Sequence, residues 1–393
     1  MKVKHKFRFY PTVSQAEDLE RLFGCVRYVY NRALALRKET FKATGKGLNY
    51  CASSAALTQW KQEQDTAWLK EPSCVPLQQA LRHLDVAYTN FLAERTKYPS
   101  FKSKHGSKQS AEFTVSGFVW DKQNHNLTVA KIGRLDIRWS RVIESKPSSI
   151  TITKNAAGRY YVTLTIEEER SKLPPSESAV GVDLGIKALA TLSTGEVIAP
   201  LNALKGKLKA LKKGQRVMHR RVKGSGRRNR QRLKVARLHA EVADARKDYL
   251  DKATTDLVRR FGVVAIENLN VSGMVQNRKL AQAISDAGFG EFRRMLEYKC
   301  EWYGRELRIV KPFEPTSKRC SKCGSINQDL TLSDRNWTCG CGAHHDRDIN
   351  AAINILAAGH VATARGERVS RSGASVSKRS ARRSVNQPGM CNV

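Results

Sequence analysis

Three acidic residues stand where a chain can gather them into one metal site. Asp183 follows an apolar run in AVGVDLGIK, and Glu267 follows another in VVAIENLN. Asp348, in HHDRDINAAINI, stands at the start of a predicted helix. Side chains at the carboxyl ends of parallel strands converge on one edge of an α/β sheet, where carboxylates repel one another unless a cation neutralises them. Mg²⁺ prefers oxygen ligands and works in pairs in enzymes that cleave phosphodiesters. Together and in this order, the acids favour a metal-dependent nuclease of the RNase H-like class.

Each acid also has a plainer interpretation. A single Asp or Glu at the end of a strand is usually a turn residue or a helix cap. Asp348 could cap a helix beginning at Ile349, and Asp346 could do the same. Only the set of three, inside an α/β pattern, favours catalysis over structure.

Two close pairs of cysteines can supply four thiolates to one tetrahedral Zn²⁺. The pairs are Cys320 with Cys323 and Cys339 with Cys341, with fifteen residues between them. The alternative is disulfide bonds, which a reducing compartment disfavours. The second pair is C-x-C where C-x-x-C is usual, and His344 and His345 lie nearby as substitute ligands. We expect one structural zinc ion.

The composition points to a polyanionic partner. The 393 residues include 70 Lys+Arg against 36 Asp+Glu, a net charge of +34, which is too basic for an ordinary enzyme of small substrates. No apolar run approaches the roughly 18 residues of a membrane-spanning helix, and the opening MKVKHKFRFYP does not look like a signal peptide. We therefore expect a cytoplasmic nucleic-acid-binding protein without a membrane partner.

One stretch concentrates the positive charge. From Lys205 to Arg237 there are fifteen Lys or Arg residues and no acid. The pattern predicts a helical hairpin turning at 224–230, with one docked face and one positive face for a phosphate backbone. A solvated charged face is the alternative, but such faces usually mix both signs. The candidate nucleic-acid contacts are Lys205, Lys209, Lys212, Lys213, Arg216, Arg220, Arg227 and Arg228.

The elements that must position these residues follow from periodicity. Residues 2–9 alternate as a strand, and helical segments then run to about residue 95, starting from a capping box at Ser14 and Glu17. Period-two runs return between 110 and 168, with a hairpin turn at 155–158. Beyond a linker at 174–178, strands alternate with helices. The expected fold class is α+β and multidomain: an antiparallel barrel interrupted by a helical bundle, then an α/β domain.

The motifs in series resemble the TnpB family. GVDLGIK, AIENLN, AISDAGFGEFRRMLEYKCEWYGRELRIV, SKRCSKCG, WTCGCG and HDRDINAAINI match its second half, and FRFYP, RYVYNRAL and GKGLNY are similar to its first. TnpB proteins are transposon-encoded RNA-guided nucleases related to the ancestors of type V CRISPR effectors. Each motif alone would be weak, but the series covers nearly the whole chain.

This resemblance implies a domain plan. Residues 1–11 and 105–172 would form a wedge-like β-barrel, split by a helical recognition domain at 12–104. Residues 173–363 would form a RuvC-like, RNase H-like nuclease domain with a zinc-ribbon insert at 314–345. Residues 364–393 are rich in Ser and Arg and predict a disordered basic tail.

The resemblance also implies a function. A monomeric protein would bind a guide RNA transcribed from the transposon end, in the cytoplasm of a prokaryote and at the nucleoid when on DNA. It would cut both strands of target double-stranded DNA beside a short transposon-adjacent motif, using two Mg²⁺ ions held by Asp183, Glu267 and Asp348. Tyr50, Ser54 and Gln78 resemble the family's surface for reading that motif.

Three rival functions remain open. A nuclease-inactive, RNA-guided DNA-binding repressor would have lost a catalytic acid, and none is lost here. A DDE-type transposase would also use three acids, but the zinc segment between Glu267 and Asp348 argues against it. In a purely structural RNA-binding protein, the acids at strand ends would have no purpose.

Overall fold

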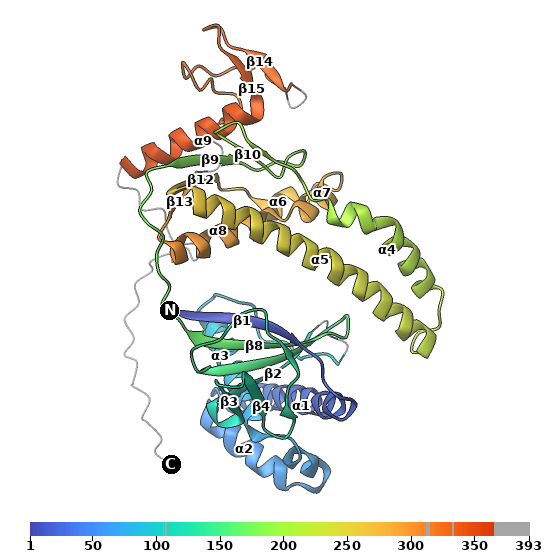
Figure 1. Ribbon diagram of the computed structural model, residues 1–393. Helices are drawn as coiled ribbons and strands as arrows, with labels where there is room; N and C mark the ends of the chain where they lie inside the picture. Colours follow the sequence, from blue (N-terminus) through green and yellow to red (C-terminus); the bar gives the residue numbers. More distant parts are fainter. Residues whose placement is uncertain (105, 107, 312–314, 332–333, 365–393) are drawn as a thin grey trace.

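The computed structural model describes residues 1–104, 106, 108–311, 315–331 and 334–364. The chain is a mixed α+β protein with several sheets (Figure 1). The tail predicted to be disordered, residues 364–393, lies outside the described residues except for Ala364, the last residue of a helix.

The first half of the chain is built on an antiparallel sheet with strand order β2-β7-β8-β1-β6. The N-terminal strand β1 (Lys2–Phe9) alternates exposed and buried residues along its length, as its sequence predicts. Its apolar side chains, among them Phe7 and Phe9, enter the core, while its basic residues stay exposed. A second sheet, β3-β4-β5, lies nearby. The remaining strands are β2 (Lys108–Thr114), β3 (Phe118–Asp121), β4 (Asn126–Val129), β5 (Gly133–Arg134), β6 (Ile137–Arg138), β7 (Ser149–Asn155) and β8 (Tyr160–Glu167).

Helices separate β1 from β2 in the sequence, and they pack against the same core as both sheets. They are α1 (Val13–Thr44), α2 (Tyr50–Gln62), the 3₁₀ helix η1 (Gln64–Lys70) and α3 (Cys74–Leu92). A single 3₁₀ turn, η2 (Val115–Gly117), leads into β3. One hydrophobic core therefore joins the helices to the strands that flank them in the sequence.

The capping box predicted at Ser14 and Glu17 is wrong by two residues. Thr12 caps α1 by accepting the N–H of Gln15 at 3.2 Å, and the Gln15 side chain accepts the N–H of Thr12 at 3.1 Å. Gln15 also donates to the carbonyls of Ile132 and Arg134. These tertiary contacts, which local sequence does not reveal, accompany the earlier start of the helix.

The second half contains a five-stranded sheet, order β11-β10-β9-β12-β13, with parallel β9, β12 and β13 and an antiparallel edge. Its strands are β9 (Ala179–Asp183), β10 (Ala190–Leu192), β11 (Val197–Ile198), β12 (Val263–Glu267) and β13 (Glu306–Val310). Helices α5 (Gly226–Arg260) and α8 (Phe289–Tyr303) cover one face and α9 (Arg347–Ala364) the other (Figure 1). The predicted alternation of strands and helices is confirmed as three layers.

Helix α9 lies unusually close to β9 because Gly181 has no side chain. A Cβ at this position would stand 1.9 Å from the carbonyl oxygen of Ala352 and 2.9 Å from the Cβ of Leu356. Backbone atoms cannot move aside as the end of a flexible side chain can. The glycine therefore sets how near the start of α9 comes to the end of β9.

The basic stretch forms the expected helical hairpin, made of α4 (Ala203–His219) and α5, and it projects from the sheet (Figure 1). The turn occupies residues 220–225 and so precedes the predicted 224–230. Ser225 is the reason, because its hydroxyl accepts the N–H of Arg228 at 3.2 Å and starts α5. The short helices α6 (Val271–Met274) and α7 (Ala281–Ala287) follow β12, while strands β14 (Asn336–Thr338) and β15 (His344–Asp346) precede α9. No described helix offers the long apolar stretch that spanning a bilayer would need.

Candidate active site and metal centre

Two of the three acids lie at the ends of neighbouring parallel strands. Asp183 is the last residue of β9 and Glu267 the last residue of β12. The register pairs Ile266 with Val182, so the two acids follow adjacent positions of the ladder. The buried Val180, Val182, Val264 and Ile266 explain why these segments become central strands.

The third acid reaches the same edge from α9. Asp348 is the second residue of that helix, which packs across β9 and β12. Asp346 is the residue that caps the helix, because its Oδ1 accepts the N–H groups of Asp348 and Ile349, each at 2.9 Å. The carboxylate of Asp348 is therefore not occupied in capping its own helix.

The electrostatics of Asp183 show that the acids share one environment. Burial raises the pKa of Asp183 to about 7, and the negative charges of Glu267 and Asp348 add to this rise while Arg347 opposes it. An isolated aspartate titrates near 3.9. Ionised Asp183 is thus disfavoured here unless a cation compensates for the crowded negative charge.

Two further residues hold the acids, and the sequence did not single them out. Thr316 donates its hydroxyl to Glu267 Oε1 at 2.5 Å, and Arg335 approaches Asp348 Oδ2 at 3.1 Å. Both come from the segment between β13 and α9, more than ten residues from the acid that they contact. Neither belongs to a recognisable local motif, so only the folded structure identifies them.

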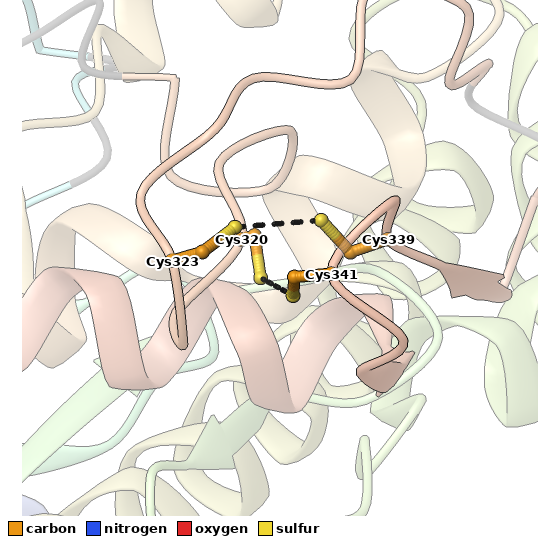
Figure 2. A group of neighbouring side chains, drawn as sticks. All are labelled: Cys320, Cys323, Cys339 and Cys341. Atoms are coloured by element: carbon orange, nitrogen blue, oxygen red, sulfur yellow. Dashed lines mark hydrogen bonds between the residues drawn. The ribbon is translucent and has the colours of Figure 1, made fainter.

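The four cysteines do converge (Figure 2). Their sulfur atoms all lie within 4.8 Å of one another, and among the described residues no other group of three or more potential ligands is as close. Cys320 Sγ is 3.8 Å from Cys341 Sγ, and Cys323 Sγ is 3.6 Å from Cys339 Sγ. These separations exceed the roughly 2.05 Å of a disulfide, and all four cysteines are free thiols. The arrangement suits a tetrahedral ion such as Zn²⁺.

Neighbouring polar groups favour the thiolate form at Cys323, whereas at Cys341 a backbone hydrogen bond to Ala343 is outweighed by the neighbouring thiols, which raise the pKa to about 11. The Ser325 hydroxyl lies 2.9 Å from Cys323 Sγ and 3.2 Å from Cys339 Sγ, and its hydrogen bond helps to lower the pKa of Cys323 to about 6. His345 Nε2 lies 3.1 Å from Cys320 Sγ, while its ring packs against Trp337. His344 turns instead to Thr338, at 2.8 Å. His345 is therefore the histidine placed next to the cluster.

The hairpin of α4 and α5 leaves most of the predicted phosphate contacts exposed. Seven of the eight candidates are exposed. The half-buried one is Arg228, whose guanidinium donates to the carbonyls of Met218 and Arg221 and so closes the hairpin turn. Asp286 secures the other end by accepting the N–H of Leu204 at 3.0 Å and pairing with Arg246 at 3.0 Å.

The three residues suggested for reading an adjacent motif lie on α2 and α3. Tyr50 begins α2 with its ring under the guanidinium of Arg82 at 5.3 Å, and Gln78 is exposed one turn before Arg82 on α3. Ser54 is half-buried on α2 and accepts from Thr58 through its carbonyl at 3.3 Å. Tyr50 and Gln78 thus lie on two helices that contact one another, and Arg82 of α3 reaches the ring of Tyr50.

Comparison with known protein families gives three matches in chain order. Residues 1–46 match a helix-turn-helix domain of the OrfB_IS605 type, residues 161–278 match OrfB_IS605 itself, described as "Probable transposase", and residues 289–355 match "Cas12f1-like, TNB domain". A Streptomyces pristinaespiralis protein named "Putative RNA-guided DNA endonuclease" is 50% identical over 365 residues, covering 92% of this chain and 90% of that protein.

The chain belongs to the TnpB family. A second relative of this TnpB chain is "Putative RNA-guided DNA endonuclease InsQ" of Escherichia coli K12, 36% identical and covering 93% of this chain and 94% of that one. The solved structure titled "Cryo-EM structure of the Cas12f1-sgRNA-target DNA complex" aligns with a TM-score of 0.60 at 12% identity, covering 91% and 98%. At that identity the likeness shows a shared fold.

Proposed function

We propose that this TnpB chain is an RNA-guided DNA endonuclease whose active site is the acid cluster of Asp183, Glu267 and Asp348. The observation that carries the proposal is their convergence at one edge of an α/β sheet, where burial, together with the charges of Glu267 and Asp348, raises the pKa of Asp183. The names of the relatives in Streptomyces and Escherichia coli support the activity.

The donor set fits hydrated Mg²⁺. A buried aspartate beside two other carboxylates is hard to ionise without a cation, and all three offer oxygen ligands. Bound Mg²⁺ ions would activate a water and stabilise the leaving oxygen of a phosphodiester. Asp183 and Glu267 would hold the ions from adjacent strands, with Glu267 oriented by Thr316. Asp348 would complete the set from α9, with Arg335 balancing its charge until DNA arrives.

The zinc centre would have a structural role. Cys320, Cys323, Cys339 and Cys341 leave no open position for a substrate on a tetrahedral ion. The segment that carries them also supplies Thr316 and Arg335 to the acids. The ion would therefore act on the nuclease site through the chain that it orders.

The basic hairpin and the helical surface would hold the nucleic acids. The exposed Lys and Arg side chains of α4 and α5 suit a phosphate backbone, whereas base pairing with a guide RNA would select the sequence. We propose that the guide derives from the transposon end, that a short adjacent DNA motif is read near Tyr50, Ser54 and Gln78, and that one protein copy forms the ribonucleoprotein.

The decisive experiment compares two aspartates two residues apart. The full chain is expressed with its native transposon end, and the purified ribonucleoprotein is tested on plasmids carrying the guide-matched target next to randomised sequence. Asp348→Asn should abolish cleavage, whereas Asp346→Asn should retain it, since Asn caps a helix as well as Asp. Equal loss in both variants, or cleavage that persists in EDTA, would contradict the assignment. Strand joining in place of linear product would favour the transposase.

A further inference from the structure

A cavity of about 500 Å³ lies away from the nuclease site, where β1, α1 and the β7–β8 hairpin meet. It is walled largely by apolar surface, and a few polar groups converge on it. Concave sites of this kind bind small molecules or single residues of a polymer. We propose that this cavity holds one unpaired guanine base of bound RNA, an inference that extends the proposed function and rests on it.

An aromatic platform stands at the cavity's edge. Tyr10 is 48% exposed and leads from the end of β1 toward α1, and the Arg8 guanidinium lies 4.9 Å from the centre of its ring. A nucleobase stacks well on an exposed tyrosine or on a guanidinium plane, whatever its identity. Tyr10 and Arg8 would thus supply affinity for a base and leave the choice of base to other groups.

The polar wall provides that choice. Lys154 and the Tyr160 hydroxyl both donate to Oε1 of Glu20, whereas Oε2 of Glu20 takes part in no hydrogen bond within the described part of the chain. Guanine presents two adjacent donors, N1–H and the 2-amino group, beside the acceptor O6. The Glu20 carboxylate can accept both donors while the Lys154 ammonium donates to O6. Adenine and cytosine each lack one of these donors, and uracil places its single N–H between two acceptors.

The charge distribution favours a base inside and phosphates outside. In the cavity lining, Lys154 is paired with Glu20 and Arg159 with Asp244 at 2.5 Å, and the remaining charged residues, Arg8 and Glu17, have opposite signs, so the interior is nearly neutral. Outside it, the exposed basic face of β1 leads through Lys2, Lys4 and Lys6 to Arg8 at the cavity's edge. Cations along the strand suit phosphates, and the neutral pocket suits a base turned out of a helix. Sequence-specific RNA recognition uses such unpaired bases.

The test uses the full chain and short RNA. Fluorescent uridine heptamers with one central guanosine, adenosine, cytidine or uridine are titrated at about 0.3 M salt, which weakens binding through phosphates alone. The guanosine heptamer should bind roughly tenfold more tightly than the others. Glu20→Gln should remove that preference. Tyr10→Ala should weaken all four heptamers roughly tenfold through loss of stacking.

Matched controls for both variants come from α1, the helix that carries Glu20. Glu39→Gln makes the same change at an exposed site outside the cavity, and Phe41→Ala removes an aromatic ring that is 60% exposed. Both should bind like the unaltered chain. Glu20 is 42% exposed, so its variant should fold, and Tyr10→Ala tests the cavity independently.

The outcomes separate this inference from the proposed function. Equal binding of the four heptamers by the unaltered chain, or equal behaviour of Glu20→Gln and Glu39→Gln, would overturn the guanine site. The same four sequences are also titrated as DNA heptamers. If the DNA heptamers bind as tightly as the RNA heptamers, the assignment of the cavity to RNA is overturned. Guided cleavage is measured on the same preparations. Cleavage without guanine preference would reject only the cavity, whereas guanine preference without cleavage would reject only the nuclease.

Discussion

The cysteine cluster and the acid cluster reach their geometry by opposite routes. The cysteines lie between residues 320 and 341 and converge within one short segment. The acids come from β9, β12 and α9 and are spread over residues 183–348 of the chain. Four thiols within 4.8 Å form a complete set of ligands, while the carboxylates converge at the cost of mutual repulsion. Local geometry makes the first site, and tertiary packing makes the second.

The largest expected effect breaks the acid cluster at its centre. Asp183→Asn should reduce DNA cleavage by about 10⁴-fold, the scale of losing a catalytic group. It should also raise the melting temperature of the metal-free protein by roughly 2–4 °C, because a desolvated charge beside two others is removed. Cleavage rates and calorimetry in EDTA check both effects. A lower melting temperature would mean that Asp183 serves stability.

Loss of one cysteine should break the other cluster. Cys320→Ser should abolish stoichiometric zinc and expose residues 315–331 and 334–346 to hydrogen exchange, since a structural zinc site contributes folding free energy directly. Metal analysis and exchange mass spectrometry measure these changes.

His345→Ala is the matched variant for the cysteine test. It removes the imidazole 3.1 Å from Cys320 Sγ and should leave zinc in place if the four cysteines are the ligands. Zinc loss in that variant would make His345 a ligand.

Gly181→Ala should separate packing from chemistry. The added methyl group would meet the Ala352 carbonyl, so the free energy of unfolding should fall by about 1–3 kcal/mol and α9 should carry Asp348 away from β9. Cleavage should fall while zinc remains bound. Gly206→Ala is the control: it lies in α4 with nothing near its Cβ position, and should stabilise the chain slightly. Unaltered cleavage in Gly181→Ala would show that α9 does not position Asp348.

The smallest expected effect is on pH. The pKa of Asp183 is raised to about 7, so its proton competes with Mg²⁺ below that pH. The Mg²⁺ concentration for half-maximal cleavage should rise about tenfold per pH unit below 7 and change little above it. In metal-free protein the same shift removes stability as the pH rises from about 4 to 7, because the native state holds a proton that the unfolded state releases. A Mg²⁺ requirement independent of pH would contradict the shared environment of the acids.

The parts of the fold that periodicity predicted were those with strong local patterns. The strands ending at Asp183 and Glu267 were foreseen because their apolar runs are buried on both sides. The cysteine cluster was foreseen because its ligands are close in the sequence. Where the spacing of apolar residues in the sequence matches the repeat of a strand or helix, local sequence suffices to predict the element.

The parts that escaped prediction depend on contacts between distant residues. The start of α1 at Thr12 accompanies Gln15 bonds to carbonyls more than a hundred residues away, and Thr316 and Arg335 meet their acids only after the segment before α9 has folded back. Helix-capping chemistry alone could not separate Asp346 from Asp348, and only the family resemblance favoured Asp348 as the third acid; the backbone then shows Asp346 in the capping position. The roles of the catalytic acids, zinc ligands and nucleic-acid contacts, and the domain boundaries, stay predictions.

The segment that carries the cysteines also affects the entropy that the chain loses when α9 docks on the sheet. It lies between β13 and α9, and Asn350 and Asn354 of α9 bind it by donating to the carbonyl of Arg319, each at 2.7 Å. Docking α9 on the sheet requires closing this long connection, and the entropy lost grows with the length of free chain. An ion that ties four of its residues together shortens the free length before α9 docks. Metal loading would then speed the arrival of the last acid at the sheet edge without touching DNA.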